Sequence, residues 1–125
     1  MEVKIIDVWE DTVLVDSSIG TFRGIWCSSY PQVSKTYIVE LDIDEVITLE
    51  AINCANTLIP CIKCEDNQTI IVGFVEDVQD DVMFLRLQKS IMMFEIAPSL
   101  EFAQYTGSYV QIRIGTIKIY DTGIY

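Results

Sequence analysis

The clearest alternation of hydrophobic and polar positions lies in the segment TYIVELDIDE, residues 36–45. Tyr37, Val39, Leu41 and Ile43 alternate with polar residues, and successive side chains of a β-strand point to opposite faces. The segment therefore predicts a half-buried strand that ends near its last aspartate. We expect the four apolar side chains to be buried and the carboxylates between them to face solvent.

Shorter segments with strand-like patterns recur along the rest of the chain, separated by polar turns. We expect strands over residues 3–9, 12–16, 19–26, 57–64, 69–75, 82–88, 90–96 and 110–119. Residues 90–96 are nearly all apolar, which predicts a strand buried on both faces or crossing the core. The parity of the apolar residues changes at Gly115, which predicts a bulge or a turn there. Residues 98–106 are the one candidate helix, with Ser99 as its cap.

Many short strands and hardly any helical periodicity predict an all-β fold, in one domain over residues 1–125. Glycines inside the strands favour a small, strongly bent barrel of the OB type, with a β-sandwich as the alternative. We find no internal repeat in the sequence.

The charge of the chain restricts its partners. Nineteen acidic and eight basic side chains give a net charge of −11, and residues 1–50 hold ten of the acids against three bases. Such a field repels nucleic acids and anionic membranes and attracts cationic proteins, although it also serves solubility alone. The N-terminal residues have no signal-peptide pattern, and no apolar run is long enough for a membrane helix. Four cysteines in a chain without an export signal are expected to be free thiols. We therefore expect a cytoplasmic protein.

The residues that usually carry chemistry are missing from the sequence. The chain has no histidine, which removes the commonest general base and the Ser-His and Cys-His pairs, so we expect no catalysis and no cofactor. Cys61 and Cys64 have zinc-like CxxC spacing, but a continuous strand would point them to opposite faces, so we expect no metal. OB-type barrels commonly bind single-stranded nucleic acid through a basic groove, yet no two Lys or Arg residues are adjacent here.

Two acidic clusters are the candidate binding residues, and an aromatic side chain on a loop is the candidate anchor. Neither cluster has the spacing or the turn glycine of an EF-hand calcium loop. A solvated surface and a surface for a basic protein both fit them. The expected partner-binding residues are Glu40, Asp42, Asp44 and Glu45 in the first cluster, Glu76, Asp77, Asp80 and Asp81 in the second, and Tyr30 on the loop that contains Pro31.

With its size, its charge, the exposed acids of TYIVELDIDE and the second acidic group EDVQDD, the whole chain resembles the small acidic immunity proteins of bacterial polymorphic and contact-dependent toxin systems. The resemblance implies a non-catalytic inhibitor that neutralises a basic, nuclease-like toxin with carboxylates and aromatic side chains. Two alternatives stay open: a structural or adaptor subunit of a larger assembly, and an OB-like nucleic-acid-binding domain.

Overall fold

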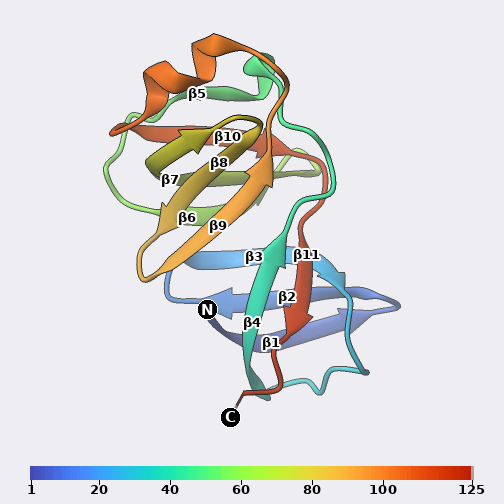
Figure 1. The fold of residues 1–125 in the computed structure, drawn as a ribbon. Helices are drawn as coiled ribbons and strands as arrows, with labels where there is room; N and C mark the ends of the chain where they lie inside the picture. Colours follow the sequence, from blue (N-terminus) through green and yellow to red (C-terminus); the bar gives the residue numbers. More distant parts are fainter. Residues whose placement is uncertain (125) are drawn as a thin grey trace.

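The structure, a computed structural model, describes residues 1–124 as two sets of strands, one above the other (Figure 1). The lower set is a closed barrel with the order β1-β2-β3-β11-β4, and the upper set is a six-stranded sheet with the order β5-β10-β7-β8-β9 and β6 paired to β7. The barrel consists of β1 (Glu2–Trp9), β2 (Thr12–Ser17), β3 (Gly20–Trp26), β4 (Thr36–Asp42) and β11 (Lys118–Asp121). The sheet consists of β5 (Ile52–Cys54), β6 (Cys61–Glu65), β7 (Gln68–Gln79), β8 (Val82–Leu87), β9 (Ser90–Glu95) and β10 (Tyr109–Ile114), with the 3-10 helices η1 (Leu49–Ala51) and η2 (Leu100–Tyr105) beside it.

The predicted all-β class and the small bent barrel are confirmed. Strands β1, β2 and β3 form an antiparallel meander, β4 returns to pair with β1, and β11 lies between β3 and β4, parallel to the first and antiparallel to the second. This is the Greek-key arrangement of a five-stranded OB-type barrel. A bulge between Ile5 and Asp7 bends β1 so that the sheet can close.

Strand β4 follows the predicted alternation closely. Tyr37, Val39 and Ile43 are buried, but Leu41 is only half-buried and packs at the margin of the core. Leu41 also lines an open groove, so the expectation that it is fully buried is wrong. The strand ends at Asp42, two residues earlier than expected.

Strand β9 differs most from its prediction. The apolar run suggested burial on both faces, but burial alternates along the strand, with Met92 and Phe94 in the core and Ile91 and Met93 at the surface. One face of β9 therefore presents large apolar side chains to solvent. The predicted helix is the 3-10 helix η2, and Ser99 caps it by accepting a hydrogen bond from the Glu101 backbone N–H at 3.2 Å.

The structure contains an internal repeat that is not evident in the sequence. Strands β7, β8 and β9 repeat β1, β2 and β3 at an offset of 70 residues, including the bulge, which lies between Val75 and Asp77 in the second copy. Both bulge aspartates accept a hydrogen bond from the next backbone N–H at 2.9 Å. Only Asp7, Val8 and Asp11 recur as identical residues in the second copy of residues 3–26. The pattern of buried positions is repeated more closely than the sequence, with Ile19 (buried) and Lys89 (exposed) as an exception.

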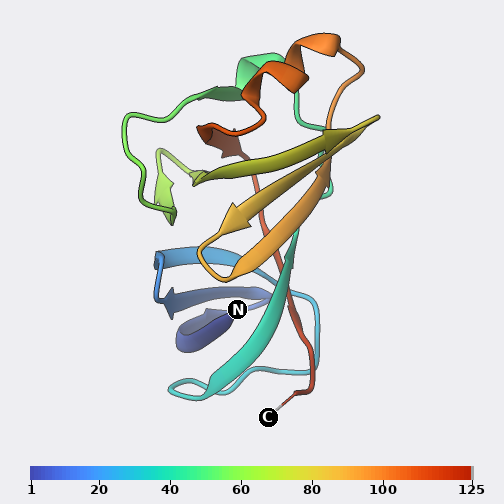
Figure 2. The same cartoon turned by 60° about the vertical axis from the view of Figure 1, so that its left-hand side comes forward.

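The two copies exchange the strands that complete them (Figures 1 and 2). After β4 in the barrel, the chain rises into the upper sheet, where Ile47 pairs in parallel with Ile96 and β5 pairs with β10. After β10 in the sheet, the chain descends into the barrel, where β11 pairs in parallel with β3. The backbone hydrogen bonds correspond: Cys27 N–H donates to Ile119 O at 2.9 Å, and Ala97 N–H, 70 residues later, donates to Ile47 O at 2.8 Å.

Candidate functional site

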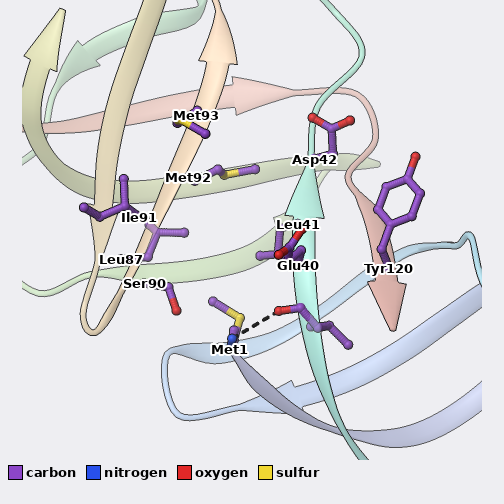
Figure 3. Close-up of a pocket in the computed structure, with 11 residues that line it drawn as sticks. Met1, Glu40, Leu41, Asp42, Leu87, Ser90, Ile91, Met92, Met93 and Tyr120 are labelled. Atoms are coloured by element: carbon purple, nitrogen blue, oxygen red, sulfur yellow. Dashed lines mark hydrogen bonds between the residues drawn. The ribbon is translucent and has the colours of Figure 1, made fainter. Parts of the chain in front are cut away.

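A groove of about 600 Å³ separates strand β4 of the barrel from strand β9 of the sheet (Figure 3). In this view the β9 residues lie on one side, and the β4 residues and Tyr120 lie on the other. The groove thus lies where the two structural repeats meet. It is lined by Met1, Val39, Glu40, Leu41, Asp42, Leu87, Ser90, Ile91, Met92, Met93 and Tyr120.

The β4 side of the groove carries the first part of the predicted acidic cluster. Glu40 is exposed and Asp42 is half-buried, and both belong to the outward-facing set of the strand. Their cross-strand partners on β11 are Tyr120 and Lys118, respectively. Carboxylates two residues apart on one strand face are held about 7 Å apart, so their charges repel each other unless a cation lies nearby.

The β9 side of the groove is apolar. The side chains of Ile91 and Met93 are 50% and 59% exposed, which is unusual for two such residues on one short strand. Their exposure is not evident from the sequence, because an uninterrupted apolar run does not reveal which residues face outward. Tyr120, 37% exposed, provides the aromatic surface on the opposite side.

The other two acids of the first cluster are held by local contacts. Asp44 forms an ion pair with Lys118, and Glu45 accepts a hydrogen bond from the backbone N–H of Gly115 at 2.7 Å. Neither lines the groove. These contacts fix the connection between β10 and β11, which leaves Glu40 and Asp42 as the acids that face the groove.

The second predicted cluster lies at the β7–β8 hairpin, and its acids have structural contacts there. Glu76 pairs with Arg86, and Asp77 accepts hydrogen bonds from Val78 N–H at 2.9 Å and from the Gln79 amide at 2.6 Å. The other two members, Asp80 and Asp81, form the turn itself, and Asp80 has a φ of 54°. The structure does not place any of these four residues in the groove.

Tyr30 is exposed on the loop between β3 and β4, as expected, but it is not among the residues that line the groove. The aromatic side chain beside the acids is Tyr120. In the sequence, its position in the last apolar segment, two residues after Lys118, is the one feature that could have drawn attention to it. The role of Tyr30 as an anchor therefore stays a prediction for the loop surface.

The two cysteines with CxxC spacing lie on strand β6. Strand β6 runs through Cys61 and Cys64, which gives them opposite parity, and all four cysteines are free thiols. Among the residues that the structure describes, no three His, Cys, Asp or Glu side chains are grouped closely enough to hold an ion.

Comparison of the chain with protein-family models, with curated proteins and with solved structures finds no match. No helix within residues 1–124 has the length and apolar character needed to cross a lipid bilayer.

Two groups beside the groove have shifted pKa values. The carboxylate of Asp44 accepts a hydrogen bond from Lys118 and attracts its charge, and both effects raise the pKa of Lys118. Partial burial of the Tyr120 phenol raises its pKa, and the neighbouring Cys27 thiol adds to the shift. The ammonium and the neutral phenol are therefore the forms that the folded protein favours.

We expect the free energy of unfolding to fall as the pH rises above about 10. The folded-state pKa values of both groups lie above their ordinary values, which are 10.5 for Lys118 and 10.0 for Tyr120. The two protonated side chains therefore contribute fully to the free energy of unfolding when the pH is below the ordinary values. This contribution is lost as the pH rises through the folded-state pKa values. Urea unfolding at about pH 9 and about pH 11 measures the loss. The double variant Lys118→Gln/Tyr120→Phe should lose less stability over this interval, and an equal loss would contradict the assignment.

Proposed function

We propose that this chain is a non-catalytic protein-binding module, an inhibitor of the immunity or antitoxin type that neutralises a basic, nuclease-like toxin through the acidic face of β4. One observation carries the proposal: Glu40 and Asp42 line the same groove as the exposed side chains of Ile91, Met93 and Tyr120. Acidic groups beside exposed apolar and aromatic groups suit a cationic protein surface with an apolar centre.

The energetics of such a complex follow from this arrangement. A cationic side chain between Glu40 and Asp42 would relieve their mutual repulsion and would be attracted to the chain from a distance. Ile91, Met93 and Tyr120 would supply the buried contacts from which most binding energy derives. The charge then governs the association rate, and the apolar contacts govern the lifetime of the complex.

The charge distribution and the resemblance to bacterial immunity proteins support this proposal. Ten of the nineteen acids lie in residues 1–50, which include β4. A field of this sign disfavours nucleic acid as the ligand of the barrel. We place the protein in the bacterial cytoplasm, where an immunity protein would meet its toxin before the producing cell is damaged.

Charge reversal on β4 tests the proposal. The partner to use is the purified protein encoded by the reading frame directly upstream, with binding measured by surface plasmon resonance at low and high salt. Glu40→Lys/Asp42→Lys should weaken binding at least about tenfold, mainly through slower association, and should remove most of the salt dependence.

The matched control is Asp11→Lys/Glu101→Lys, which changes the net charge by the same amount at exposed acids outside the groove. The control should retain most of the affinity. Equal losses in the two double variants would show that only the overall charge matters. Unchanged affinity in the β4 variant would mean that Glu40 and Asp42 serve solubility and that the acidic face of β4 is not the binding surface, and no binding by the wild type would favour the adaptor alternative.

A further inference from the structure

Within residues 1–124, the outer edge of β9 has no partner strand along most of its length. The β8–β9 ladder pairs Met92 with Leu85 and Phe94 with Met83, and Ile96 N–H donates to Asp81 O at 2.8 Å. Because backbone groups of successive residues in a strand point to opposite edges, those of Ile91 and Met93 point away from β8. At Glu95 the outer edge is already used, since its carbonyl accepts a hydrogen bond from Ile47 N–H at 2.9 Å.

In the described part of the chain, the backbone N–H and C=O groups of Ile91 and Met93 make no hydrogen bond, and the groove lies along the strand that carries them. An edge with free donors and acceptors is a template for another strand. Proteins commonly protect such edges with charges, prolines or a covering segment. Here the neighbouring side chains are apolar and exposed instead.

The first structural repeat shows how the equivalent edge is covered. Strand β3 corresponds to β9, and β6 lies along its outer edge: Ile62 N–H donates to Ile19 O at 3.0 Å, and Arg23 N–H donates to Cys64 Sγ at 3.3 Å. Met93 is the counterpart of Arg23, 70 residues later. The chain thus covers one copy of the edge with its own five-residue strand and leaves the other copy open to the groove.

We propose that an extended segment of a cationic partner protein binds in this groove by adding a strand to the outer edge of β9. The proposal rests on the function proposed above and gives the mode of binding. Backbone hydrogen bonds to Ile91 and Met93 supply affinity, and the side chains along the groove supply selectivity. The length of β6 indicates a segment of about five residues.

The groove also determines the chemistry of the segment. Side chains of an added strand alternate between two faces. One set meets the apolar surface of Ile91 and Met93, and basic side chains near β4 meet Glu40 and Asp42 across the groove. The segment is therefore expected to combine Val-like or aromatic residues with Lys or Arg.

A phage-displayed library of random decapeptides tests the proposal without the toxin. Selection on the immobilised protein should enrich peptides in which Lys or Arg alternates with apolar residues. A synthetic peptide from the selection should slow hydrogen exchange of the Met93 amide, because that N–H becomes a donor in the new ladder. Absence of enrichment, peptides without basic residues, or unchanged exchange at Met93 would each overturn the proposal.

Two substitutions of Met93 distinguish the contribution of its backbone N–H to peptide binding from the contribution of its side chain. Met93→Pro removes the outward N–H but no bond to β8, and proline is tolerated on strand edges of this kind. It should weaken the selected peptide at least about tenfold relative to Met93→Ala, which keeps the N–H. Equal affinities in the two variants would overturn strand addition. If the proline variant does not fold, the hydrogen-exchange measurement at Met93 of the wild-type protein is the test of strand addition.

The remaining outcomes separate the two proposals. A dimer of the peptide-free protein that Met93→Pro dissociates in sedimentation experiments would assign the edge to a second copy of this chain and overturn the partner proposed here. If Glu40→Lys/Asp42→Lys weakens toxin binding while Met93→Pro does not, the proposed function stands and strand addition fails. If basic peptides add to β9 while the upstream protein does not bind at all, strand addition stands and the immunity function fails.

Discussion

Ile119→Ala is expected to lower the free energy of unfolding by about 2–5 kcal/mol, the range for truncating a fully buried aliphatic side chain. Ile119 lies on β11 with no exposed surface, between β3 and β4 in the closed barrel. Its side chain packs directly over Gly24, where a Cβ would lie 2.7 Å from its Cδ1 atom. The residue therefore fills the centre of a unit whose other four strands all lie within residues 2–42.

Urea denaturation of the wild type and of Ile119→Ala measures this effect, and Ile124→Ala is the matched control. Ile124 is 66% exposed, so its truncation should change the free energy of unfolding by no more than about 0.5 kcal/mol. Amide exchange should also accelerate across β1, β2 and β3 in Ile119→Ala. A loss below about 1 kcal/mol would contradict the placement of β11 in the barrel.

Gly20→Ala is expected to destabilise the protein by about 3–5 kcal/mol, because two unfavourable effects act at one position. Gly20 has a φ of +136°, a region that only glycine adopts readily, and a Cβ there would overlap the carbonyl oxygen of Ile62. The backbone of β6 would have to move away from β3, which would strain the hydrogen bond between Ile62 and Ile19.

Gly107→Ala is the control for backbone strain alone. Gly107 has a φ of +82°, but apart from its two chain neighbours no heavy atom of the described residues lies within 4 Å of the position that a Cβ would take, so only the conformational cost of about 1–2 kcal/mol applies. Thermal or urea unfolding of the two variants measures the difference. If Gly20→Ala were no worse than Gly107→Ala, the close approach of β6 to β3 would be wrong.

The structural features that could be predicted from the sequence are those that depend on residues close together in the chain. Alternation identified β4, and the polar residues between the strands expected over residues 3–9 and 12–16 correctly marked the turn between β1 and β2. The change of parity at Gly115 marks the point where the strand expected over residues 110–119 divides into β10 and β11, so a turn there is confirmed and a single bulged strand is wrong. These features follow from the period of a strand and from turn chemistry, which act within a few residues.

The features that the sequence did not predict depend on contacts between distant residues. Nothing local in β11 indicates that it pairs with β3 and β4 rather than with its neighbour β10. The repeat was hidden because core positions accept different apolar residues, such as Phe22 in one copy and Met92 in the other. The groove was missed for the same reason, since it forms only where the two copies meet.

The exchange of strands between the repeats has a consequence for how the chain folds during synthesis. A nascent chain that has emerged through β4 has four strands of the barrel but lacks β11, which follows about 75 residues later. At ordinary elongation rates the unclosed edges of β3 and β4 stay unpaired for several seconds. The barrel can therefore close only after translation has passed residue 121, and pairings of such high sequence separation form slowly. The N-terminal half of this protein, although made first, is expected to be the last to become resistant to proteases on the ribosome.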